Sequence, residues 1–396
     1  MNRQYLRNIA DIQTGPFGSQ LHKEDYVAVG TPIVTVEHLG NRVFTEQNLP
    51  RVSDEDKARL LKYVLAEGDM VFSRVGSVDR CSYVDAAHDG WMFSGRCLRV
   101  RPNSEIDPLF LYYFFCLEET KQFVRNIAVG ATMPSINTKL LGEVEVTYPS
   151  LTDQQKIAAI LSALDNKIEI NQKINDNLYT QARAITNRWI AENKDDYDLL
   201  SLSEIAAINP DTYSPKEEWE YVNYLDTSSI TDGCIADIQR IIPASEKLPS
   251  RARRIIAPND VVFSTVRPNQ RHFGIISEPL PNMLASTGFA VIRSENPLVC
   301  NELIYLCLTE NAFIEKMQQL AEQSTSTFPS IKPSDLGVCE IPCPKDGLSS
   351  NLTETLRAVF ALVAANHREN ASLAELRDSL LPKLMTGEID VSDIQI

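Results

Sequence analysis

An eight-residue segment, Gly68-Asp69-Met70-Val71-Phe72-Ser73-Arg74-Val75, is repeated 191 residues later as Asn259-Asp260-Val261-Val262-Phe263-Ser264-Thr265-Val266. A second segment, Ala131-Thr132-Met133-Pro134-Ser135-Ile136-Asn137, returns as Ser326-Thr327-Phe328-Pro329-Ser330-Ile331-Lys332. Each half of the chain then ends in a long stretch with helical hydrophobic spacing. Internal repeats indicate duplicated structural units, so the sequence predicts two similar globules related by an approximate two-fold axis. A molecule of this kind suits a target with two half-sites, of which duplex DNA is the commonest.

The hydrophobic spacing of both helical stretches is that of a heptad repeat, with steps that alternate between four and three residues. The first seam runs through Ile157, Leu161, Leu164, Ile168, Asn171, Asn175, Leu178, Ala182, Ile185 and Trp189. The second runs through Leu352, Leu356, Val359, Val363, Asn366, Asn370, Leu373, Arg377, Leu380 and Leu384. Arg377 interrupts the second seam, where we expect Leu376 to cover the gap. A seam of this length favours a coiled coil.

Four asparagines lie in the middle of the two seams, and we expect them to fix the register of the helices: Asn171, Asn175, Asn366 and Asn370. An antiparallel pairing brings them together near the centre and places the globules at opposite ends of a rod. Thr152 and Gln155 predict a capping box at the start of the first helix. Pro382 predicts a kink in the second helix and Gly387 its end. The alternative is that each helix packs on its own globule alone.

The remaining sequence is typical of α+β domains with short strands. Tyr63–Ser73 and Arg254–Ser264 each read as a turn that leads into a strand. Pro108–Val124 and Asn301–Leu320 read as helices late in each globule. We therefore predict a first target-recognition globule at 1–150, a spacer helix at 151–193, a second globule at 194–345, and a second spacer helix with a C-terminal tail at 346–396.

The charge of the chain argues against a free-standing DNA-binding protein. The net charge is -15 and the pI is about 4.9, whereas DNA-binding domains usually have a basic balance. The basic residues are unevenly spread, and residues 240–272 contain few acidic side chains beside Arg240, Lys247, Arg251, Arg253, Arg254, Arg267 and Arg271. We expect other subunits to supply much of the phosphate neutralisation.

Polar side chains at the ends of the repeated strands are the candidates for DNA contact. Arg suits guanine, Asn and Gln suit adenine, and Ser or Thr suits either a base or a phosphate. A loop with two glycines, Gly15-Pro16-Phe17-Gly18-Ser19, supplies further candidates. The proposed DNA-binding residues are Ser19, Gln20, Lys23, Ser73, Arg74, Arg251, Arg253, Thr265, Arg267, Asn269 and Arg271. For any one of them the plain alternative is an ordinary exposed polar side chain.

Other classes of function lack their sequence signals. The eight cysteines contain no CxxC pair and the five histidines show no metal-ligand spacing, so we expect no metal site and idle thiols in a reducing compartment. No nucleotide-binding P-loop, methyltransferase tetrapeptide, nuclease pattern or nucleophile elbow occurs. No signal peptide or membrane-spanning run occurs, and we expect a cytoplasmic, non-catalytic protein without a membrane partner.

Taken in order along the chain, these motifs resemble those of one family. They include Gly15-Pro16-Phe17-Gly18-Ser19, the repeated strand, Pro149-Ser150-Leu151-Thr152-Asp153-Gln154-Gln155-Lys156-Ile157, and Leu380-Leu381-Pro382-Lys383-Leu384-Met385-Thr386-Gly387. The chain resembles the specificity subunit of type I restriction-modification enzymes over nearly its whole length. The second helix begins differently, with Leu348-Ser349-Ser350-Asn351-Leu352-Thr353, and this departure weakens the expectation of partner contacts there.

The resemblance implies a DNA specificity subunit that takes part in host defence. Each of its two recognition domains is expected to read one half of a split double-stranded DNA site. Its helices are expected to hold two methyltransferase (modification) subunits, which two motor-endonuclease (restriction) subunits join for cleavage. S-adenosylmethionine is expected in the methyltransferase partner, with no cofactor bound by this chain. The alternative is a two-headed coiled-coil scaffold that does not bind DNA sequence-specifically; a stand-alone enzyme is disfavoured by the missing motifs.

Overall fold

The computed structural model describes residues 1–18, 20–40, 42–130, 132–214, 216–323, 329–345 and 349–394, without the side chains of 349 and 350. Contacts divide the chain into two compact units, Met1–Ile168 with Ala371–Ile396 and Glu169–Asn370. Two long helices, α6 (Leu151–Glu192) and α11 (Ser349–Thr386), contribute residues to both units. Each unit therefore combines one globule with parts of both helices, whereas the expected limits at 150, 193 and 345 follow the linear order of elements.

The first unit is built on an antiparallel sheet in the order β2-β8-β5-β6. Its strands are β2 (Ala10–Thr14), β5 (Met70–Ser73), β6 (Cys81–Tyr83) and β8 (Cys97–Pro102). A smaller sheet has the order β4-β3-β7, with β3 parallel to β7, and β1 pairs with β9. The remaining elements are β1 (Asn2–Tyr5), β3 (Tyr26–Val34), β4 (Arg51–Val52), β7 (Met92–Phe93), β9 (Glu145–Tyr148), α1 (Leu6–Ile9), α2 (Asp54–Arg59), α3 (Pro108–Cys116), α4 (Glu118–Ile127) and α5 (Thr138–Gly142).

The second unit repeats this plan. Its main sheet has the order β11-β20-β17-β18, and each strand holds the place of its counterpart in the first unit. The parallel pair β12 and β19 corresponds to β3 and β7. The elements are β10 (Tyr197–Ser201), β11 (Ala206–Ile208), β12 (Val222–Leu225), β13 (Ile230–Thr231), β14 (Cys234–Ile235), β15 (Gln239–Ile241), β16 (Ala252–Ile255), β17 (Asp260–Ser264), β18 (Phe273–Ile276), β19 (Met283–Ser286), β20 (Phe289–Ser294), β21 (Glu340–Pro344), α7 (Leu202–Ile205), α8 (Asn301–Leu308), α9 (Asn311–Glu322) and α10 (Pro333–Gly337). The duplicated α+β architecture is confirmed.

The repeated strand is apolar at successive positions because both faces of its sheet are covered. Met70 and Phe72 point into one core, whereas Val71 belongs to the core on the opposite face. In β17 Val261 and Phe263 likewise point into one core, and Val262 belongs to the core on the opposite face. Alternation of side chains along a strand explains the division. A central strand buried on both faces shows the short continuous apolar run that the repeat carries.

The aspartate of the repeat fixes the turn that precedes the strand. Asp69 is buried, accepts a hydrogen bond from the Ala66 amide, and forms a two-point ion pair with Arg101 at 2.6 and 2.7 Å. In the second unit Asp260 pairs with Arg293 at 2.8 Å through both of its carboxylate oxygens. The paired, hydrogen-bonded carboxylate offsets the free energy of burying its charge.

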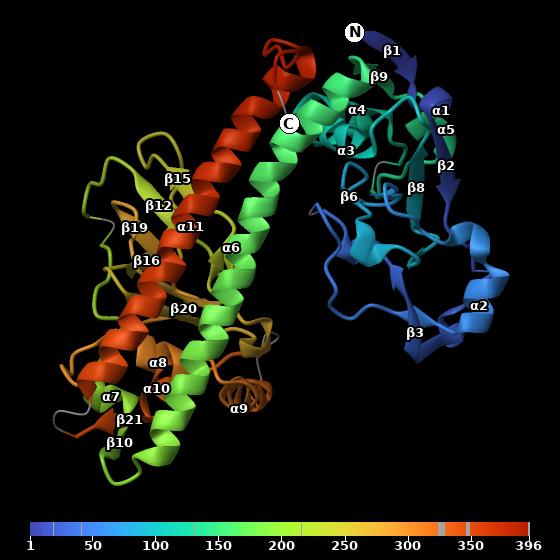
Figure 1. Cartoon of the computed structure of the whole chain (residues 1–396). Helices are drawn as coiled ribbons and strands as arrows, with labels where there is room; N and C mark the ends of the chain where they lie inside the picture. The colour runs from blue at the N-terminus through green and yellow to red at the C-terminus, as the bar shows by residue number, and fades with distance from the viewer. Residues whose placement is uncertain are drawn as a thin grey trace. The chain divides into compact units, whose positions relative to one another are not determined.

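Helices α6 and α11 run antiparallel within each unit (Figure 1). In the first unit Arg377 Nη1 lies 2.7 Å from Asp165 Oδ1. In the second unit Asn171 donates to Asn370 at 2.8 Å, and Asn366 donates to Asn175 at 2.7 Å. These cross-helix bonds overturn the alternative in which each helix packs on its own globule alone.

The observed seam departs from a strict heptad in three places. Ile185 is 39% exposed, and Thr186 is buried in its place. Asp165 is buried beside the half-buried Leu164. Leu376 is 46% exposed and covers no gap, because Arg377 itself turns inward to Asp165. An α-helix drifts by about 20° per heptad relative to a 3.5-residue repeat, so a seam extrapolated at heptad spacing moves out of the interface.

Several expected helix limits are also wrong. The cap of α6 is Ser150, whose hydroxyl accepts from the Asp153 amide, and not Thr152. The helices expected at Pro108–Val124 and Asn301–Leu320 are each broken in two, at Leu117 and around Thr309. Helix α11 continues through Pro382. It ends at Thr386, as expected, because Gly387 takes the left-handed conformation that stops a helix.

Candidate nucleic-acid interface

The glycine-containing loop of the first unit packs directly on the chain that enters β8. A Cβ atom at Gly15 would lie 2.1 Å from the Ser94 carbonyl oxygen, and one at Gly95 would lie 2.3 Å from the Pro16 carbonyl oxygen. Two backbones can approach this closely only where neither carries a side chain. The glycines therefore allow this loop to pack closely against the backbone of Ser94 and Gly95.

Arg74 lies beside this loop, so the structure brings two groups of candidate residues together. Its guanidinium stands 5.4 Å from the centre of the exposed Phe17 ring and donates to the Gly95 carbonyl. Gln20 follows on the same loop, where its side-chain oxygen accepts from the Tyr63 hydroxyl at 2.6 Å. Lys23 is exposed at the start of a 3-10 turn. Ser19, also proposed, lies outside the described residues.

Ser73 and Thr265 are placed differently from the expected base-reading positions. Both are buried. The Ser73 hydroxyl donates to the Val75 carbonyl at 2.7 Å, and the Thr265 hydroxyl donates to the Gly288 carbonyl at 2.9 Å. These hydroxyls close the strand end locally, as Ser and Thr often do at turns. We therefore remove both residues from the proposed contact set.

In the second unit the candidates gather on the short 3-10 turn η6 (Pro268–Gln270). Arg267 and Arg271 flank this turn, and both take the left-handed conformation, with φ of 47° and 58°. Asn269 is exposed between them, with its amide bonded to Gln318 on α9. Non-glycine residues rarely adopt positive φ, and where they do the strain often marks a functional position.

Arg251 and Arg253 lie on a neighbouring segment, at the start of β16. Arg251 is exposed, and its carbonyl accepts a hydrogen bond from the Thr287 amide at 2.8 Å. The carbonyl of Gly288, the residue after Thr287, accepts a hydrogen bond from the Thr265 amide at 2.8 Å. This chain of backbone bonds connects the β16 arginines to the end of β17. Arg253 is half-buried, with its carbonyl bonded to the Tyr213 amide.

The second repeated segment forms part of the same surface, which the sequence alone did not assign. In the first unit the Ile136 amide donates to the Arg74 carbonyl at 2.9 Å, and the Gly76 amide donates to the Pro134 carbonyl at 2.8 Å. The second unit repeats both bonds at 2.9 Å, from Ile331 to Thr265 and from Arg267 to Pro329. We call this arrangement the strand-end junction. Repetition of both segments in the same order was the sequence signal for it.

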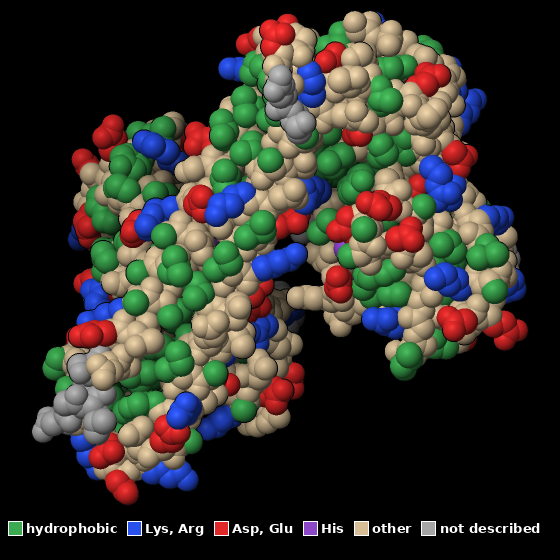
Figure 2. All heavy atoms as spheres, in the orientation of Figure 1, with side chains coloured by type: hydrophobic (Ala, Val, Ile, Leu, Met, Phe, Trp, Pro, Cys, Tyr) green, Lys and Arg blue, Asp and Glu red, His purple; other side chains and the backbone are tan. Residues whose placement is uncertain are grey.

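The region around residues 240–272 carries less net positive charge than the composition of this segment alone indicates. Arg271 forms an ion pair with Asp232 at 2.6 Å and donates to Asn311 at 3.0 Å. On the face drawn in Figure 2, Lys and Arg side chains alternate with Asp and Glu. Part of the positive charge near η6 is therefore already neutralised by this chain.

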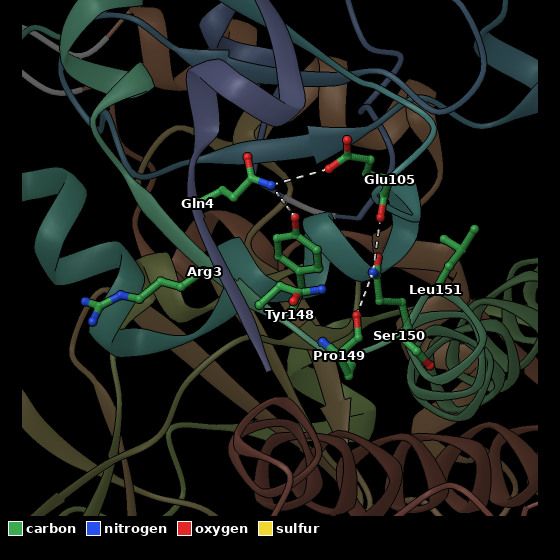
Figure 3. A pocket seen from close by; sticks show the side chains of 9 residues that line it. Arg3, Gln4, Glu105, Tyr148, Pro149, Ser150 and Leu151 are labelled. Atoms are coloured by element: carbon green, nitrogen blue, oxygen red, sulfur yellow. Dashed lines mark hydrogen bonds between the residues drawn. The ribbon is translucent and has the colours of Figure 1, made fainter.

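A cavity of about 430 Å³ lies away from these candidates, at the start of α6 (Figure 3). The buried Gln154 beside it receives a hydrogen bond from the Asp107 amide and donates to the carbonyls of Glu105 and Pro149. Gln4 reaches Glu105 and Tyr148 across the same hollow. The cavity thus reflects how the helix start is anchored, and we assign it no ligand.

Neither a metal centre nor a membrane span emerges from the part of the chain that the structure describes. No group of three or more His, Cys, Asp or Glu side chains converges among those residues. Within the same residues, no helix is both long and apolar enough to cross a membrane.

Comparison with known proteins identifies the architecture. Residues 5–180 match the type I restriction modification DNA specificity domain. The type I restriction enzyme HindI specificity subunit of Haemophilus influenzae is 24% identical, with 83% of this chain and 88% of that protein covered. The MjaIX specificity subunit of Methanocaldococcus jannaschii is 22% identical over 98% of this chain and 93% of its own length.

The chain is similar to type I restriction-modification specificity subunits along nearly its whole length. The crystal structure of such an S subunit from M. genitalium has the same fold, with a TM-score of 0.54 at 18% identity, covering 97% of this chain and 95% of that one.

The close approach at Gly15 predicts that Gly15→Ala destabilises the first unit. Overpacking of this kind typically costs about 1–3 kcal/mol, since the added methyl group would displace the Ser94 backbone. Gly18→Ala is the matched control, because no atom lies within 4 Å of the position that its Cβ would occupy. Thermal unfolding of the two purified variants gives the comparison; equal midpoints would contradict the assigned role of Gly15.

Proposed function

We propose that this chain is a DNA specificity subunit that reads a bipartite double-stranded DNA site, with one half-site contacted by each unit. The observation that supports the proposal is the strand-end junction. Both units hold the same backbone hydrogen bonds there, at Arg74–Gly76 and at Thr265–Arg267, but they present different side chains. A shared scaffold with different exposed groups suits two half-sites of different sequence.

The candidate residues divide by chemistry into two groups. Lys23 and Arg251 are exposed cations, and we propose that they contact phosphates and thereby position the DNA. Arg267, Asn269 and Arg271 lie on one strained turn and carry the groups that read guanine and adenine edges. Arg74 and Gln20 are the corresponding base-reading candidates of the first unit. Arg253 flanks the candidates of the second unit.

We further propose that the paired helices set the spacing between half-sites and carry the catalytic partners. Two methyltransferase subunits would dock on the helices, and two motor-endonuclease subunits would join for cleavage. The acidity of the chain supports a need for such partners, because its net charge of -15 opposes DNA on its own. S-adenosylmethionine would then be held by the methyltransferase subunit, which flips out the adenine to be modified.

Selection from a random duplex library tests the proposal directly. The chain is co-purified with the methyltransferase subunit encoded beside it, and the retained DNA is sequenced. The expected result is a split motif with a fixed gap. Retention of DNA without a motif, or no retention by the intact complex, would instead support a protein scaffold without sequence-specific DNA binding.

Replacing Arg267 separates recognition from folding. Gly76 occupies the equivalent place in the first unit with φ of 75°, so Arg267→Gly is expected to retain the turn and the fold. In the same library selection, sequence preference should relax at one position of one half-site, equivalent to a loss of about 1–3 kcal/mol of discrimination. Uniform weakening over all sequences would make Arg267 a phosphate contact instead.

Lengthening the helices tests whether they act as a ruler. Insertion of one heptad into both α6 and α11 preserves the pairing faces and adds roughly 10 Å of helix. The gap between the two halves of the selected motif should increase, whereas the half-site sequences should stay the same. A matched control inserts seven residues into an exposed loop of one globule. An unchanged gap in the helix variant would refute the spacer role.

A further inference from the structure

The two asparagine bonds between α6 and α11 are equivalent by sequence. Every α11 seam position lies 195 residues after its α6 counterpart, so Asn366 corresponds to Asn171 and Asn370 to Asn175. The observed pairs, Asn171 with Asn370 and Asn175 with Asn366, are therefore two versions of one contact. A second α6 in the same antiparallel register would form the amide contact by pairing Asn171 with Asn175. It would lose the hydrogen bond that Asn171 donates to Glu369 of α11 at 2.7 Å, because position 369 corresponds to Ile174 of α6. The amide contact itself fixes the register without distinguishing α11 from another copy of α6.

A neighbouring pair in the first unit lacks this equivalence. Arg377 of α11 donates to Asp165 of α6 at 2.7 Å, and the Tyr113 hydroxyl of α3 donates to the other carboxylate oxygen at 2.6 Å. The side chain of Asp165 is 9% exposed and that of Arg377 is 28% exposed. Arg42, from the segment between β3 and β4, donates to the side chain of Asn166, the next residue of α6. This is an ion pair set into the interface between the two helices.

The counterpart pair in the second unit is apolar. Position 165 corresponds to Phe360, and position 377 corresponds to Ala182, both of which are buried. The Phe360 ring lies 5.4 Å from that of Tyr179 and 5.6 Å from that of Tyr305, both in edge-on geometry. The same place in the repeat thus holds a charged pair in one unit and an aromatic cluster in the other.

We propose that this unequal pair makes the helix interface selective, so that α6 accepts α11 and rejects a second copy of α6. Pairing of two α6 helices would place each Asp165 opposite Ala182 of the other copy, which leaves two buried carboxylates without their arginine. A buried charge that loses its partner is strongly destabilising. Pairing of two α11 helices would place Arg377 opposite Phe360, at a smaller cost because the longer, more exposed arginine can reach water.

Single substitutions in the full-length chain reproduce these mismatched contacts. Arg377→Ala places Asp165 opposite alanine, as two α6 helices would, and Asp165→Phe places phenylalanine opposite Arg377, as two α11 helices would. The double variant Asp165→Phe/Arg377→Ala installs the pair of the second unit in the first. Tyr113 and Arg42 remain in every variant, so the comparison isolates what position 377 adds. The readout is the thermal unfolding midpoint of each chain.

The expected order is a large loss of midpoint for Arg377→Ala, a smaller loss for Asp165→Phe, and recovery of most of the loss in the double variant. The double variant Asp165→Asn/Arg377→Ala should also recover most of the lost midpoint, because it removes the unpaired charge while keeping the shape of the side chain. If Arg377→Ala alone fails to fold, this double variant replaces it in the comparison. Arg188→Ala, in an exposed pair with Glu192, is the control and should leave the midpoint unchanged. Additive losses, or an Arg377→Ala chain as stable as the parent, would overturn the proposal.

Discussion

The pairing of α6 with α11 is the constraint on which both units depend. The core of the first unit contains Leu381 and Leu384 from α11 beside Leu161 from α6, and that of the second contains Ala182 from α6 beside Leu356 from α11. Each core thus combines helices from distant parts of the chain: the second unit is one continuous segment, Glu169–Asn370, with a helix at each end, whereas the first joins Met1–Ile168 with Ala371–Ile396. A globule therefore packs completely only when the distant helix has arrived in the correct register, and buried asparagines, which tolerate few alternative partners, supply that register.

The sequence predicted the parts of this fold that repeat. Two similar copies of a buried strand, and two seams with asparagines at matching positions, can be recognised without coordinates because a duplicated pattern rarely arises by chance. The limits of the elements were less predictable. Extrapolation at heptad spacing placed Ile185 inside, although it is exposed, and treated Arg377 as a defect, although it forms an ion pair. The partner of a buried charge comes from a distant segment, and periodicity carries no information about it.

The sequence indicated which segments carry exposed polar side chains, but not which of their residues are exposed. The proposed segments do carry exposed groups: Lys23 after the glycine-containing loop, Arg251 before β16, and Asn269 on the turn after β17. Ser73 and Thr265 occur in the same segments, yet their hydroxyls satisfy neighbouring carbonyls and never reach the surface. A short polar side chain at a strand end serves a local hydrogen bond as readily as a ligand, and only its burial distinguishes the two roles.

The two units differ most informatively where their backbones agree. The amides of Gly76 and Arg267 each donate to a proline carbonyl from a left-handed conformation. Glycine adopts that conformation freely, whereas an L-residue incurs a cost of roughly 1–2 kcal/mol. The first unit shows that the same backbone hydrogen bond forms with glycine, so that bond does not itself require arginine. Strain retained where a less strained residue fits is typical of a side chain held for function. The turn that carries Arg267 and Arg271 is therefore where the proposed recognition of the second unit would diverge from that of the first.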